Sequence, residues 1–228
     1  VYFEGVIDAL TTLPQVATAG ITTTLPLTRT GIDFNLPYRR EGEPPRPENE
    51  MPEVDYRIVS AAYRAAMGIP LLRGRDLAPT DRAETGRVVL VNRAFAEVLW
   101  PGEDPIGRRV FIHYIADEGL DWEIVGVVGD TRHTGIAAPP EPQIFVPMTQ
   151  AEWLFDYMAL VVRTRGPAGD AIPGVRAAAL AMDPTEPLFD INTMAALRAA
   201  DVARERLALR LLGLFAVLAL VLATTGVY

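Results

Sequence analysis

Residues 88–101 read VVLVNRAFAEVLWP, and this stretch decides the fold class. Val88 to Val91 are apolar and mostly β-branched, which is typical of a strand buried on both faces. Asn92 follows directly and can accept a hydrogen bond from the first turn of a helix. Pro101 must end that helix, because its ring clashes with the carbonyl one turn earlier. The buried side of the expected helix carries three apolar residues: Phe95, Val98 and Leu99.

Further strands are expected on both sides of this stretch. Each is a short run of apolar or β-branched residues bounded by Gly, Pro or polar residues. The expected strands are Val16–Thr24, Ile32–Tyr38, Val54–Val59, Val110–Tyr114, Trp122–Val128, Gln143–Val146 and Met158–Arg163. Between the second and third lies Arg39–Pro52, whose prolines and charges predict an exposed loop.

Helices are expected between these strands. An opening helix ends before Pro14, and its apolar stripe is Phe3, Val6, Ile7 and Leu10. A short helix is expected at Ala61–Met67. A longer one, capped by Asp170, is expected to turn inward Ile172, Val175, Ala179 and Met182. The alternation of helices and strands predicts an α+β, or mixed α/β, fold.

The C-terminal residues Leu211 to Tyr228, LLGLFAVLALVLATTGVY, contain no charged side chain. A membrane-spanning helix needs about 20 such residues, so we expect the start of a transmembrane helix, with a buried core helix as the alternative. Thr193 is a plausible N-cap, and neither Pro nor Gly follows it before Gly213. One unbroken helix is therefore expected to join the domain to the membrane. Both ends of the chain are expected to be cut from a longer protein.

Composition excludes several classes of function. The net charge of -8 argues against a surface for nucleic acid. The chain has no cysteine, so it offers no disulfide framework and no thiolate zinc site. It also has no lysine, which excludes an ordinary phosphate-binding loop with its lysine. Its single serine, Ser60, lies outside any GxSxG turn, and its histidines, His113 and His133, are far apart.

Three segments carry charged residues that chemistry could use. In GDTRH, Asp130, Arg132 and His133 form either an active-site cluster or, as we favour, a turn whose Asp binds backbone amides and pairs with an arginine. Trp100–Arg109, WPGEDPIGRR, is either an anion site or, as we favour, a structural loop. The acidic residues Asp117, Glu118 and Asp121 lack regular calcium-ligand spacing and favour a solvated hairpin. We therefore expect no catalytic, cofactor-binding or metal-ligating residue, and no cofactor.

Four motifs occur in an order that resembles a known family. They are MGIPLLRGRD (67–76), VLVNRAFAEVLWPGEDPIGRR (89–109), WEIVGVVGDTRHTGI (122–136) and PPEPQIFVPMTQ (139–150). Together they look like the MacB-like periplasmic core domain, and most closely that of acidobacterial duplicated permeases without an ATPase of their own. The segment Leu211–Tyr228 is similar to the first helix of an FtsX-like permease domain.

The resemblance implies a domain outside the cytoplasm, attached to the inner membrane. It implies a porter-like βαβ subdomain at residues 1–55 and 155–200, an inserted mixed α/β subdomain at 56–154, and a connecting helix with a truncated transmembrane helix at 201–228. Against this topology, four arginines precede the apolar run, and a positive flank normally stays cytoplasmic. The rule weakens for long translocated domains, and Asp201 and Glu205 offset the arginines, so we follow the family topology. The arginines are Arg198, Arg204, Arg206 and Arg210.

The resemblance also implies function and partners. We expect a non-catalytic permease subunit of an ABC-type exporter, which transmits ATP-driven motion to efflux of a substrate. Its expected partners are a separate ABC ATPase and a second permease half or a second copy. A periplasmic adaptor, an outer-membrane channel and membrane lipid at Leu211–Tyr228 are further candidates, and nucleic acid is not. The alternatives are an FtsX-like signalling permease that regulates a cell-wall hydrolase, and a membrane-anchored enzyme.

Overall fold

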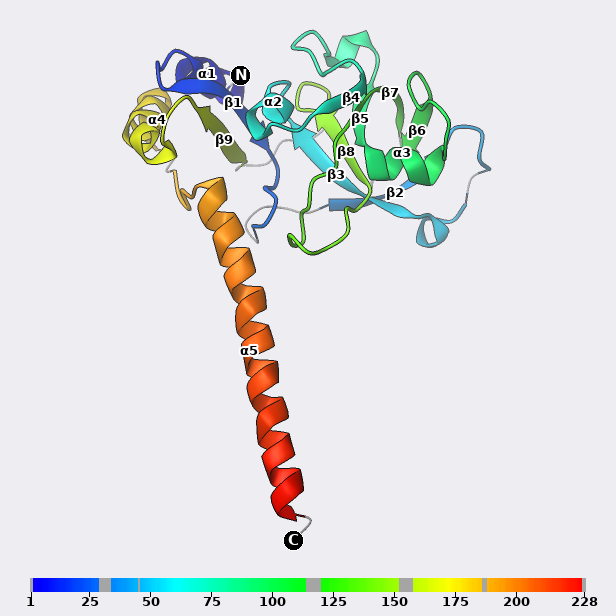
Figure 1. Cartoon of the computed structure of the whole chain (residues 1–228). Helices are drawn as coiled ribbons and strands as arrows, with labels where there is room; N and C mark the ends of the chain where they lie inside the picture. Colours follow the sequence, from blue (N-terminus) through cyan, green and yellow to red (C-terminus); the bar gives the residue numbers. More distant parts are fainter. Residues whose placement is uncertain are drawn as a thin grey trace.

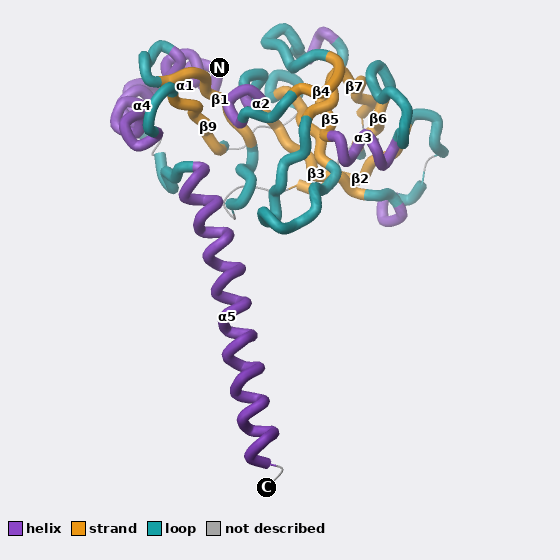
Figure 2. Tube along the Cα trace, in the orientation of Figure 1, coloured by secondary structure: helices purple, strands orange, loops and turns teal. Residues whose placement is uncertain are grey.

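The structure is a computed structural model, and it describes residues 2–28, 34–44, 46–113, 120–151, 158–185 and 188–226, without the side chains of 204–209. Strands and short helices form one body, and a single long helix projects away from it (Figures 1 and 2). This mixed α+β architecture confirms the expected fold class.

The helices are α1 (Tyr2–Thr11), α2 (Tyr63–Met67), α3 (Arg93–Leu99), α4 (Ala168–Met182) and α5 (Met194–Gly226). The strands are β1 (Val16–Thr22), β2 (Phe34–Arg40), β3 (Glu53–Val59), β4 (Leu71–Gly74), β5 (Val88–Asn92), β6 (Arg109–Ile112), β7 (Leu120–Val128), β8 (Gln143–Pro147) and β9 (Ala159–Thr164). Two short 3-10 helices are present, η1 (Glu48–Glu50) and η2 (Ala83–Thr85).

Six of the strands close into a ring. Hydrogen bonds connect them in the order β2-β6-β7-β5-β8-β3, and β3 then pairs with β2, where Tyr56 lies opposite Phe34. β5 runs parallel to β7 and β8 runs parallel to β3, whereas the other neighbours in the ring are antiparallel. A closed ring leaves none of these six strands with a free edge along its paired residues, and it encloses a core.

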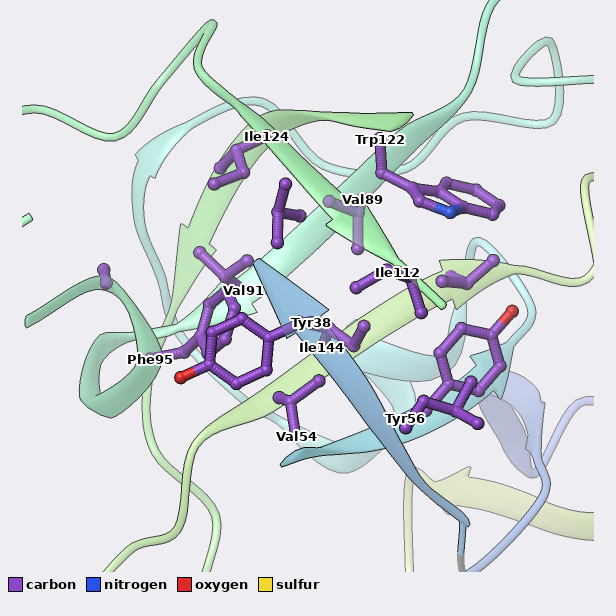
Figure 3. Close-up of a cluster of buried hydrophobic side chains, with 14 of the residues drawn as sticks. Tyr38, Val54, Tyr56, Val89, Val91, Phe95, Ile112, Trp122, Ile124 and Ile144 are labelled. Atoms are coloured by element: carbon purple, nitrogen blue, oxygen red, sulfur yellow. The ribbon is translucent and has the colours of Figure 1, made fainter. Parts of the chain in front are cut away.

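The core inside the ring is built from the side chains that alternate inward along each strand (Figure 3). Trp122, Ile124, Ile112 and Ile144 are fully buried there. Phe95 of α3 closes one side of this core, with its ring 4.9 Å from the ring of Tyr38 in an edge-to-face arrangement. Apolar residues from all six strands of the ring thus share one core. This is possible because every second side chain of a strand points to the same face of the sheet.

Three strands lie outside the ring: β4 pairs with β7, and β1 and β9 extend the sheet beyond β3. β1 meets β3 at the pair Thr22–Val59 and pairs along its length with β9. Helices α1 and α4 pack together on this part of the sheet, where Val6 and Leu10 of α1 are buried against Ala19. In Figure 1 these four elements lie together at one end of the body, and the ring lies at the other.

All of the expected strands are present, with shifted ends. β2 runs through Arg40, so the exposed loop begins after the expected Arg39, and its last turn contains η1. The expected start of this strand at Ile32 lies outside the described residues. β4 was not expected, because LLRG shows no alternation, and its pairing with β7 is a tertiary contact.

Two helical predictions about burial and one about capping are wrong. Val98 is 58% exposed, because α3 turns Phe95 and Ala96 toward the ring. Met182 is 45% exposed at the last turn of α4. Asp170 lies inside the first turn of α4 and does not cap it, since the helix begins after Pro167.

The N-cap of α3 is confirmed and leads to a prediction. Asn92 Oδ1 accepts hydrogen bonds from Phe95 N at 3.0 Å and from Gln143 N at 2.9 Å, and Asn92 Nδ2 donates to Glu141 O at 2.8 Å. Asn92→Ala would leave a helix cap open and buried backbone groups unpaired. We expect a loss of about 2–4 kcal/mol of unfolding free energy, measured by urea denaturation. Glu97→Ala, at an exposed position of the same helix, is the control and should change stability little; equal effects would contradict the assigned role.

Helix α5 is continuous over 33 residues, as expected, and Thr193 Oγ1 accepts a hydrogen bond from Ala196 N at 3.1 Å as its N-cap. Apolar side chains of its C-terminal half are exposed, from Leu211 at 46% to Leu222 at 70%. Within the described part of the chain, no helix combines the length and the apolar character required to cross a membrane. The expected transmembrane segment therefore stays a prediction.

Candidate functional site at the junction with helix α5

Helix α5 is joined to the body by a hydrogen bond to the loop between β7 and β8. Asp201 Oδ2 on α5 accepts from Ile136 N at 2.9 Å. On the other side of the same residue, the Arg132 guanidinium donates to the Ile136 carbonyl. Both backbone polar groups of Ile136 are thus used, so the loop presents a fixed contact point to the helix.

The start of this loop is attached to helix α3. Asp130 Oδ1 accepts from Ala94 N at 2.8 Å, and Asp130 Oδ2 accepts from Arg93 Nε at 3.0 Å and Nη2 at 2.9 Å. A carboxylate at the first turn of a helix satisfies a free amide and interacts favourably with the helix dipole. Asp130 therefore binds a backbone amide, as predicted, but the arginine that it pairs with is Arg93 of α3 and not Arg132 of its own segment.

The remaining residues of GDTRH have separate partners. The backbone carbonyl of His133 accepts from Leu27 N at 3.0 Å, which ties the loop to the segment after β1. Thr131 Oγ1 donates to Gln143 Oε1 at 2.5 Å. Asp130, Arg132 and His133 thus contact three different parts of the chain, and their contacts build a junction.

Beneath the loop lies a buried polar cluster made of Asp55, Arg57 and Gln143. Arg57 donates to Asp55 Oδ2 from Nε at 3.0 Å and from Nη2 at 2.7 Å, and Gln143 Nε2 donates to the same oxygen at 2.7 Å. Arg57 Nη1 donates to Thr24 O at 3.0 Å. The side chains of Asp55 and Arg57 are only 10% and 3% exposed. A buried charge pair keeps its position only when its remaining hydrogen bonds are made, as they are here.

Tyr63 packs beside this cluster. Burial raises the pKa of Tyr63 to about 12, while Arg57 and a hydrogen bond with Thr22 lower it in part. Its backbone also approaches β1 closely, since a Cβ on Gly20 would lie 2.5 Å from Tyr63 Cα. The phenol therefore stays neutral at physiological pH and packs as part of the core.

The loop Trp100–Arg109 has mainly structural contacts. Gly107 adopts φ +79°, which favours glycine, and its N donates to Ile124 O at 2.8 Å. Arg108 pairs with Glu103 and lies over the ring of Trp100. An open depression of about 410 Å³ adjoins this loop, but both arginines that line it, Arg40 and Arg108, already pair with glutamates.

The acidic tip can be placed only in part. Asp117 and Glu118 lie outside the described residues, and Asp121 lies on β7. Among the residues that the structure describes, no three His, Asp or Glu side chains are grouped so as to hold a metal ion.

Sequence reasoning did not single out the residues of the buried cluster or of the α5 contact. Asp55 and Arg57 could have been noticed, because they interrupt the apolar strand EVDYRIV at alternate positions. On a strand these positions share one face, opposite the face that enters the ring core. Gln143, Ile136 and Asp201 offer no such pattern, because they are separated in sequence and meet only after folding.

Comparisons with known proteins place this geometry in context. A model of the MacB-like periplasmic core domain matches residues 7–181, which is more than half of the chain. The periplasmic region of MacB from Actinobacillus actinomycetemcomitans superimposes with a TM-score of 0.55 at 12% identity, over 78% of this chain and 72% of that one. The extracellular domain of the noncanonic ABC-type transporter YknZ from Gram-positive bacteria gives 0.52 at 16% identity, over 79% and 81%.

At these identities, the structural matches establish a shared fold. No curated protein matches the sequence. The family match rests on the body of the molecule, since the matched range ends at residue 181, before α5 begins.

Proposed function

The chain belongs to the MacB-like periplasmic core domain family, and we propose that it is the extracytoplasmic domain of an ABC-type permease subunit. In this proposal it performs no chemistry of its own. A separate ATPase moves the membrane part, and helix α5 passes that motion to the domain. The efflux of a substrate is the output.

The observation that carries this proposal is the unbroken helix α5 and its attachment. A helix of 33 residues without an internal proline transmits displacement along its axis, because each turn is held by backbone hydrogen bonds. The Asp201–Ile136 hydrogen bond lets a movement of α5 reach the loop that holds α3 and the buried cluster. A passive anchor would not need such a connection.

We propose that residues 211–228 enter the membrane. The support is the absence of charge over this run and the exposure of its apolar side chains. The proposed partners are the ATPase and a second permease half or copy; an adaptor and an outer-membrane channel would complete an export path. The division at residues 55 and 155 also stays a proposal, and it must accommodate the pairing of β2 with β6 across it.

Distance measurement between spin labels tests the proposed coupling. Since the chain has no cysteine, labels on Glu97→Cys and Ala219→Cys are site-specific. In the permease reconstituted with its ATPase, trapping the ATP-bound state should shift the distance between α3 and α5. Asp201→Ala should broaden the distribution of distances between the two labels and remove its nucleotide-dependent shift, because the helix loses its contact with Ile136.

Asp201→Asn is the matched control, since its amide oxygen can still accept from Ile136 N. It should keep the wild-type distances. If the distance between the labels in the wild-type complex does not change with nucleotide, the proposal that α5 transmits motion is wrong. If the Asp201→Ala variant keeps the wild-type distances and the nucleotide-dependent shift, Asp201 does not take part in the coupling.

A further inference from the structure

A groove of about 550 Å³ lies between helix α5 and the loop that contacts it. Among the described residues, its lining combines small or apolar side chains with two arginines. The lining residues are Ile136, Arg198, Ala199, Val202, Ala203 and Arg210. All but Ile136 come from α5, where their spacing places them on one side of the helix. Among the described side chains, Ala199, Val202 and Ala203 form the small and apolar part of this lining, and Arg198 and Arg210 form its charged part.

The arginines of this groove are available to a ligand. Among the described residues, neither Arg198 nor Arg210 forms a salt bridge. The carboxylate of Asp201 is engaged with Ile136 N. Arg132, bound to the Ile136 carbonyl, adds positive charge at the edge of the groove. The groove thus offers two guanidinium groups that have no salt-bridge partner among the described residues, with the Asp201 carboxylate beside them.

The position of the groove indicates what kind of anion it takes. Arg210 directly precedes the exposed apolar surface that begins at Leu211 and continues to Leu222. A ligand at Arg210 thus lies at the boundary between a cationic site and an apolar surface. That combination fits an amphiphile with an anionic head. An acidic peptide would pair with the arginines, but it would make no contact that accounts for the adjoining apolar surface.

We propose that this groove binds the phosphate of an anionic membrane lipid at Arg210. The guanidinium fork of arginine matches a phosphate in two hydrogen bonds. Arg198 is twelve residues away, about 18 Å along the helix axis, so it adds weaker attraction at longer range. The bound lipid would fix the depth of α5 at the membrane surface. This inference rests on the proposed membrane location of residues 211–228.

Vesicle flotation tests the proposal. The full chain is diluted from detergent into vesicles of phosphatidylcholine alone or of phosphatidylcholine mixed with phosphatidylglycerol. We expect binding to both, through the apolar part of α5, with a clear preference for the anionic vesicles that weakens as salt is added. Arg210→Gln should reduce that preference about fivefold, which is about 1 kcal/mol. Arg198→Gln should reduce it less.

Arg73→Gln, an exposed arginine on β4, is the matched control and should keep the preference. Equal binding to both vesicle types, or an Arg73→Gln effect as large as that of Arg210→Gln, would overturn the lipid site while leaving the membrane proposal intact. Failure to bind either vesicle would overturn both. Inorganic phosphate should not displace the chain from anionic vesicles; full displacement at constant ionic strength would show a site for free anions.

Discussion

Asp55→Ala is expected to destabilise the domain by about 3–5 kcal/mol, the usual cost of leaving a buried charge without its partner. Arg57, whose side chain is 3% exposed, would lose both hydrogen bonds to Asp55 Oδ2, and Gln143 Nε2 would lose its acceptor. The measurement is chemical denaturation of the purified domain followed by circular dichroism. Since domains of this kind have limited total stability, a loss of this size can unfold a large fraction of the chain.

Two variants make this prediction specific. Arg93→Gln removes the ion pair with Asp130, and because the Arg93 side chain is 59% exposed, the expected loss is about 1 kcal/mol or less. The double variant Asp55→Leu with Arg57→Met removes both buried charges together. It should recover much of the stability lost in Asp55→Ala. If Asp55→Ala is no more damaging than Arg93→Gln, the buried cluster does not hold the ring and the loop together.

Ala208→Pro is expected to abolish coupling between the ATPase and the domain. Residue 208 lies within the continuous helix α5, and a proline there removes a backbone donor and clashes with the preceding turn, at a cost of about 3 kcal/mol or a kink. The ring core is distant in sequence and should stay folded. In the reconstituted permease, ATP hydrolysis should therefore continue while export falls to background.

Ala208→Leu is the control, because leucine is a strong helix former. The spin-label pair on α3 and α5 gives a second readout that does not depend on knowing the substrate. In Ala208→Pro its distance should no longer follow nucleotide. Wild-type export together with wild-type distances in this variant would mean that α5 is not the transmitting element, and that the domain is a passive docking surface.

The local elements of this protein could be predicted from the sequence. The apolar run Val88–Val91 and the cap at Asn92 are decided by side chains within a few residues of each other, and both were found. The same is true of Thr193 and the long helix after it. Apolar periodicity and helix capping depend on residues close together in the chain, so the sequence alone predicts them.

Which side of a short helix is buried depends on contacts with residues that are distant in sequence. Val98 has the spacing of an inward residue, yet it is exposed, because the packing of α3 on the ring selects a different side of the helix. β4 has no local pattern and forms because β7 continues beyond its pairing with β6, where its residues 126–128 can pair with another strand. In both places the deciding partner is distant in sequence.

The order of residues along the chain already specifies a mixed α+β fold, a family resemblance carried by four motifs, and an uncharged apolar run at residues 211–228. Only folding closes six strands into a ring, connects the GDTRH segment to α3 and Gln143, and brings Ile136 of the same loop against α5. The difference lies in how far apart the interacting residues are in the sequence. Helix caps and apolar periods depend on neighbours in the chain, whereas ring closure and the Asp201–Ile136 contact join residues whose approach no local preference encodes.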